Sequence, residues 1–144
     1  MFEKDTVKLL KECDAGVKMG ISSLDDVIPR TKAEDLKKML KTCKNEHKKL
    51  GEEIESLLSQ YGNSGKAPNP IAKVMSHIKT NMKMAMHYSD ATIADLITDG
   101  CNMGVKSLNK YLNEYKAANE FSKDITKRLI NLEERLTVDI RDYL

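Results

Sequence analysis

The sequence predicts an all-α protein, an antiparallel four-helix bundle built from two αα-hairpins. Apolar residues recur every three or four positions over long stretches, and no stretch alternates as a half-buried strand would. Trp is absent and aromatic residues make up 5% of the chain, which favours helices packed through Leu, Ile, Val and Met. The segment CDAGVK at 13–18 also returns as CNMGVK at 101–106. This echo predicts two similar hairpins packed about a pseudo-twofold axis.

The first hairpin is predicted from two periodic segments separated by a proline. Residues 5–28 are expected to form one helix, which Pro29 ends. Thr31 is expected to cap a second helix over 32–61, with Glu34 at the spacing of a capping box. The inward positions expected on this second helix are Leu36, Leu40, Cys43, His47, Leu50, Ile54, Leu57 and Tyr61.

The second hairpin follows a long crossover. Residues 62–67 have loop composition, and Asn69 and Pro70 predict the start of a short helix over 70–87. A long helix is expected over about 91–118, and a last one after a break near 119–122, burying Phe121 or Ile125. The chain is thus predicted to be one domain, 1–144, with hairpins at about 5–61 and 90–144 and a crossover at about 62–89.

Composition excludes several classes of function. The net charge is +2 and charged residues alternate in sign, so the basic stripe of a nucleic-acid-binding protein is missing. No apolar run reaches membrane-spanning length, and the N-terminus has no apolar signal region. Three cysteines lie within helical patterns, as thiols in a reducing compartment do. We therefore expect a cytoplasmic protein that binds neither nucleic acid nor membranes.

A resemblance to a known family is based on Asp14 and Gly16 in the first helix and on residues 101–104 in the third. Two hairpins joined by a long crossover have ferritin-like connectivity. The chain resembles an uncharacterised bacterial family of ferritin-like four-helix bundles, which has an Asp-Gly element in the first bundle helix. That family also has a Cys-Glu-x-Gly-Glu element in the third and a short helix in the crossover. Asn102 and Val105 stand where its pattern has acidic residues.

The familiar di-iron ligand set is missing from the sequence. Such a site needs a Glu on two helices and Glu-x-x-His on the other two. The last bundle helix has no His, and its Glu133 and Glu134 are expected to flank the inward positions Leu132 and Leu136. The three histidines, His47, His77 and His87, follow Lys44, Val74 and Met84 at that spacing. An ordinary di-iron site is therefore not expected.

A smaller polar group remains as the candidate core site. With a turn near Pro29, Asp14 is expected to lie level with His47 and close to Cys13, with Glu46 at the flank. One interpretation is half of a transition-metal site, or a general base oriented by a carboxylate. The favoured alternative is a structural polar pair that fixes the register of the helices.

The cysteines and glycines each allow two interpretations. Cys13, Cys43 and Cys101 are all expected to face inward, as separate core thiols rather than a soft-metal cluster, because no Cys-x-x-Cys spacing occurs. Glycine pairs four residues apart, at 16 and 20 and at 100 and 104, allow close helix packing. The first and third bundle helices are expected to approach there, or else to leave space for a ligand beside Asp14.

The segment Met82, Met84, Met86 and His87 is the remaining unusual feature. Core filling is favoured for it, contact with a partner helix comes second and copper binding third. No phosphate loop, nucleophile elbow or dinucleotide motif is present, so no catalytic residue is predicted. The sequence favours a non-enzymatic bundle without a cofactor that associates with itself or with a helical protein partner. The alternative is a metal-binding or small-ligand-binding bundle that uses Asp14 and His47, helped by Cys13 or Glu46.

Overall fold

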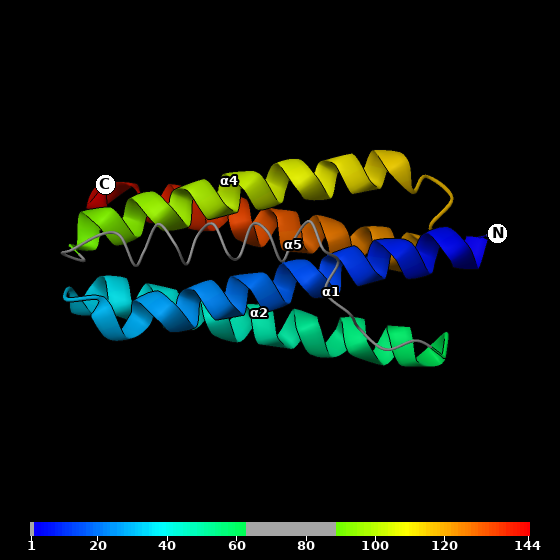
Figure 1. Ribbon diagram of the computed structural model, residues 1–144, viewed down its shortest axis with the longest axis horizontal. Coiled ribbons are helices and arrows are strands. Elements are labelled where there is room, and N and C mark those ends of the chain that lie inside the picture. Colours follow the sequence, from blue (N-terminus) through cyan, green and yellow to red (C-terminus); the bar gives the residue numbers. More distant parts are fainter. Residues whose placement is uncertain (1, 63–88) are drawn as a thin grey trace.

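The computed structural model describes residues 2–62 and 89–144, and within these ranges the regular structure is helical (Figure 1). The predicted crossover helix, with its Met82, Met84, Met86 and His87, lies outside the described residues. None of the described helices is both long enough and apolar enough to cross a lipid bilayer. The elements are α1 (Phe2–Val27), η1 (Ile28–Arg30), α2 (Glu34–Gln60), α4 (Asp90–Glu114), α5 (Glu120–Asp139) and η2 (Arg141–Tyr143). An all-α arrangement of four long helices is confirmed for this part of the chain.

The turn between α1 and α2 differs from the predicted capping box. The Thr31 hydroxyl donates to the Val27 carbonyl at 2.9 Å and does not cap α2, whose N-cap residue is Ala33. The carboxylate of Asp90 instead accepts the N–H groups of Lys32 and Ala33, at 2.8 and 2.9 Å. A carboxylate suits this place because the N-terminus of a helix presents unpaired N–H groups and a positive dipole end. The first turn of α4 is thereby tied to the start of α2.

The break between α4 and α5 comes earlier than predicted, because α4 ends at Glu114. Asn119 is the N-cap of α5, and its side chain accepts a hydrogen bond from the Ser122 N–H. The Asn119 N–H in turn donates to the Thr6 hydroxyl at 2.8 Å. This loop is therefore fixed against the beginning of α1.

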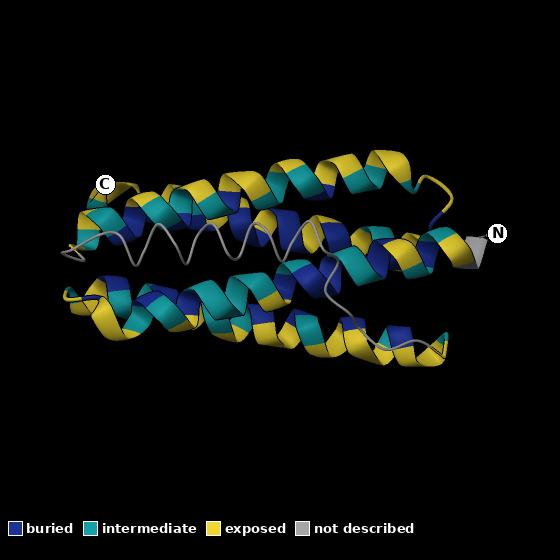
Figure 2. Ribbon diagram, viewed as in Figure 1, coloured by how far each residue is buried: buried dark blue, intermediate teal, exposed yellow. Residues whose placement is uncertain are grey.

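The core follows the predicted apolar stripes with two departures. Leu58 is fully buried, whereas Leu57 is half-buried, so the α2 stripe continues four residues after Ile54 and not three. Ile125 is buried, but Phe121 is 76% exposed, so of these two alternatives the Phe121 one is wrong. Figure 2 shows the buried residues facing the interior of the bundle along all four helices.

Helices α1 and α5 occupy the middle of the bundle. Each of them packs against all three of the other long helices. Side chains that α5 directs toward α1 therefore also lie near residues of α2 and α4. This arrangement creates the polar group in the core.

Candidate functional site

His47 on α2 is the centre of this core group. Its Nδ1 lies 2.8 Å from the Cys43 carbonyl oxygen, and its Nε2 lies 3.0 Å from Glu133 Oε1 on α5. Both partners accept hydrogen bonds, so an imidazolium that donates from both nitrogens satisfies both. Burial alone lowers the pKa of His47. Hydrogen bonds with Cys43 and Glu133, together with the carboxylate charge, outweigh burial and raise this pKa to about 10.

Glu133 is the core residue that the sequence analysis missed. It was expected to flank the inward face of the last helix, yet it is 9% exposed. Both Leu132 and Glu133 are buried, because α5 packs against neighbours on three sides. A signal was present: Glu133 lies four residues after Leu129 and three before Leu136, on one helical face.

The predicted pair between Asp14 and His47 does not form, although both residues are buried as expected. Asp14 Oδ2 lies 2.7 Å from Lys18 Nζ, one turn along α1, without hydrogen-bond geometry. His47 lies against Gly20, six residues further along α1 and about 9 Å from the predicted level. The contact between Gly51 and Val17 shows the same register, and the 3-10 turn of η1 lies between α1 and α2.

Gly20 provides the space for the imidazole. A Cβ at this position would lie 2.9 Å from both Cδ2 and Nε2 of His47, closer than side chains pack. The ring therefore lies directly on the backbone of α1. A Cβ at Gly51 would similarly come within 3.1 Å of Val17. The close approach thus occurs between α1 and α2, whereas it was expected between the first and third bundle helices.

All three cysteines are buried and free, and Cys43 Sγ lies 3.5 Å from His47 Nδ1. Cys13 Sγ lies 3.1 Å from the Thr126 hydroxyl, and burial raises its pKa to about 12. Burial also raises the pKa of Cys101, and the nearby Glu133 carboxylate raises it further. Because the thiolate is the reactive form, the raised pKa values make Cys13 and Cys101 poor nucleophiles.

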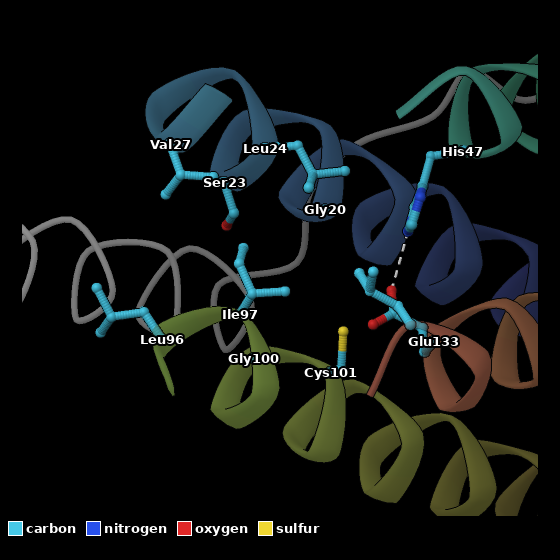
Figure 3. Close-up of a pocket in the computed structure, with 11 residues that line it drawn as sticks. Gly20, Ser23, Leu24, Val27, His47, Leu96, Ile97, Gly100, Cys101 and Glu133 are labelled. Carbon is cyan, nitrogen blue, oxygen red and sulfur yellow. Dashed lines mark hydrogen bonds and ion pairs between the residues drawn. The ribbon is translucent and has the colours of Figure 1, made fainter. Parts of the chain in front are cut away.

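Two small cavities border the α1–α4 seam, and Glu133 lines both of them. The first has a volume of about 30 Å³, with His47 and Glu133 at one end and Leu96 and Val27 at the other (Figure 3). The second, also about 30 Å³, lies beside Gly16, Gly104 and Glu12. A water needs roughly 10–15 Å³, so each cavity has room for about two or three waters.

The predicted metal candidates do not converge. Asp14, His47 and Cys13 are buried with separate partners, and Glu46 lies near the surface, 3.6 Å from Arg135. In the part of the chain that the structure describes, no three His, Cys, Asp or Glu side chains are placed to hold a metal ion together.

A second candidate site lies on the surface between α2 and α5. Three open clefts of about 350, 340 and 430 Å³ follow one another along these helices and share lining residues. We call this surface the α2–α5 groove. It is formed by Met39, Glu46, Leu50, Glu53 and Leu57 on α2 and by Phe121, Ile125, Arg128, Leu132 and Arg135 on α5.

The groove combines apolar side chains that range from buried to exposed with charged edges. Arg128 donates to both carboxylate oxygens of Glu53, at 2.9 and 3.2 Å, across the groove. Phe121, the most exposed of the large apolar residues described, stands at one end beside Leu57 and Ile125. Such a mixture is typical of surfaces that contact other proteins.

Comparison of the chain with known protein families, characterised proteins and solved structures found no match. Its function is therefore argued from the two sites described above.

Proposed function

We propose that this chain is a non-enzymatic helical-bundle protein that acts by binding another protein chain through the α2–α5 groove. The proposal rests on the exposure of Phe121, whose side chain is 76% exposed beside a cleft of about 430 Å³. Exposing a phenylalanine to water is unfavourable, by roughly 1.5–3 kcal/mol relative to full burial. Exposed aromatic residues beside clefts are common anchors of protein interfaces.

The core group supports this proposal because its chemistry suits architecture better than catalysis. The acidic, basic and thiol groups around His47 bond to one another and lie deep in the bundle. The adjoining cavity, about 30 Å³, is far below the roughly 300–1,000 Å³ of sites for small organic ligands. A buried polar pair of this kind can specify which helices pack together and in what register.

We further infer an antiparallel bundle of ferritin-like connectivity, in keeping with the family that the sequence resembles. Two contacts support this inference: the α1–α2 turn bonds to Asp90 at the start of α4, and the α4–α5 loop bonds to Thr6 near the start of α1. We also infer that the protein acts in the cytoplasm. Its buried free thiols support this location, because thiols stay reduced there.

Photo-cross-linking tests the proposed binding surface. A photoreactive phenylalanine analogue replaces Phe121 in one variant and Val138, which is 52% exposed and borders none of the clefts described, in the control. We expect a defined protein adduct from position 121, absent from position 138 and lost when Arg128 is replaced by Glu. Equal labelling at both positions, or no adduct at position 121, would refute the proposal.

The alternative from the sequence, a bundle that binds a single metal ion, would have to use His47 and Glu133, which border the core cavity. Metal analysis by mass spectrometry of protein purified without a His tag or chelator tests it. Stoichiometric metal that is lost in a His47→Leu, Glu133→Met variant would establish this candidate. Metal below one-tenth of an equivalent after incubation with excess Zn²⁺ or Fe²⁺ would eliminate it.

A further inference from the structure

The two edges of the α2–α5 groove carry opposite charges at matching levels. Arg128 and Arg135 lie seven residues apart on α5, and Glu53 and Glu46 lie seven residues apart on α2. Arg128 pairs with Glu53 at 2.9 Å, and Arg135 with Glu46 at 3.6 Å. At these two levels α2 presents glutamates and α5 presents arginines. The other charged side chains that line the groove are of both signs: Asp35, Lys38, Lys49 and Glu52 on α2, and Asp124 and Asp139 on α5.

A surface that carries an acidic residue on one edge and a basic residue at the same level on the other is complementary to itself at that level. Rotation by 180° about an axis that runs along the groove exchanges the two edges and leaves every residue at its own level. It places α5 of one copy over α2 of the other, so that Arg128 faces Glu53 of the second copy and Arg135 faces its Glu46. Such self-complementarity is what an isologous two-fold interface requires.

We propose that the partner bound by the α2–α5 groove is a second copy of this chain, related by a two-fold axis along the bundle. This inference rests on the proposed function and names the occupant of the same surface. The rotation also brings Phe121 of each copy over the α2 segment that contains Ser56 and Leu57 in the other. There it enters the cleft of about 430 Å³.

The charged side chains have capacity for this second partner. The Arg135 side chain is 61% exposed, and its contact with Glu46 is long for a charge-assisted hydrogen bond. A guanidinium has five N–H donors, so Arg135 can contact the glutamates of both copies.

The size of the groove fits a dimer interface. From Asp35 to Ser56 the clefts follow α2 for 21 residues, or about 32 Å at 1.5 Å per residue. Two helices each about 10 Å wide give a face of roughly 600 Å² on each copy. The total of roughly 1,200 Å² lies at the lower limit of stable interfaces, so we expect a dimer that dissociates on dilution.

Charge-reversal substitutions in the groove test whether this surface forms the dimer. Sedimentation velocity of the full chain over a concentration series should show a monomer–dimer equilibrium. A Glu46→Arg, Glu53→Arg variant has basic residues on both edges, and an Arg128→Glu, Arg135→Glu variant has acidic residues on both. We expect each alone to dimerise at least about tenfold more weakly than the wild-type chain, because like charges then face each other.

Mixing these two variants should restore dimerisation, because the arginines at positions 46, 53, 128 and 135 of one then face the glutamates of the other. A Lys106→Glu, Lys110→Glu variant, altered at exposed positions of α4, should dimerise as the wild-type chain does. A wild-type chain that stays monomeric at every concentration overturns the inference. So does a dimer that the groove substitutions leave unchanged, or a mixture of the two variants that stays monomeric.

The two proposals fail in distinguishable ways. A monomeric wild-type chain whose position 121 cross-links to a different protein would refute the second copy and leave the binding function standing. A monomeric chain without any adduct at this position would refute both.

Discussion

Removing either partner of the buried ion pair between His47 and Glu133 should destabilise the protein far more than replacing both partners together. His47→Leu leaves the Glu133 carboxylate in the core without its cation, and Glu133→Met leaves the imidazole without its anion. Removing one partner of a buried pair costs about 3–5 kcal/mol, because the remaining charge is uncompensated. We expect each single variant to lose this much free energy of unfolding.

The double variant, His47→Leu with Glu133→Met, removes both charges and fills the site with apolar side chains of similar size. Such replacements are often neutral or stabilising, so we expect its stability to lie within about 2 kcal/mol of the wild-type chain. The double-mutant cycle then gives a coupling energy of at least about 3 kcal/mol between the two positions. Urea denaturation at pH 7, followed by circular dichroism at fixed temperature, measures all four proteins.

The partly exposed pair of Asp25 on α1 and Lys44 on α2, which lies outside the groove, is the matched control. The same cycle with methionine at both positions should give a coupling of about 0–1 kcal/mol, because water screens this pair. Single losses at His47 and Glu133 below about 1 kcal/mol that simply add in the double variant would refute the buried ion pair.

Three further predictions concern the same contacts. The pKa of His47 is raised to about 10 in the fold, so its contribution to stability should be complete below the unfolded pKa of about 6.5 and disappear between pH 6.5 and 10. Urea midpoints measured over this range should fall accordingly, and those of a His47→Leu, Glu133→Met variant should not show this loss. Gly20→Ala should destabilise by about 1–3 kcal/mol in urea because its Cβ meets the imidazole, whereas Gly16→Ala, with its nearest contact at 3.8 Å, should be neutral or stabilising by up to about 1 kcal/mol. Asp90→Ala should lower stability by about 1–2 kcal/mol in thermal unfolding, and Asp95→Ala, at an exposed position, should not.

The apolar stripes predicted the helices but not their relative levels. Periodicity reports which face of a helix is buried, so the inward places of Leu36, Leu40 and His47 followed from the sequence. The level of one helix against the next depends on the turn between them. A turn near Pro29 did not by itself give that level: the structure has a 3-10 turn at Ile28–Arg30 and places His47 beside Gly20, not beside Asp14.

Glu133 and Phe121 show where polarity misleads a sequence analysis. A glutamate next to a leucine in a charged helix is expected at the surface, and a phenylalanine near a helix start is expected in the core. In the structure Glu133 is buried and Phe121 is exposed. Local spacing places Glu133 on the face that Leu129 and Leu136 share, but it does not contain the partner that satisfies the carboxylate, a histidine 86 residues away.

The buried pair of His47 and Glu133 also has a consequence for how the chain associates with a second copy. An ion pair in the core is satisfied only when α2 and α5 keep the level that His47 and Glu133 define. The same level aligns Glu46 with Arg135 and Glu53 with Arg128 on the surface of these two helices. A slip by one turn, about 5.4 Å, would separate the buried charges and would also misalign both surface pairs. The core pair thereby holds in register the charges that the proposed two-fold interface uses, so loss of the core pair should weaken dimerisation without any change at the surface.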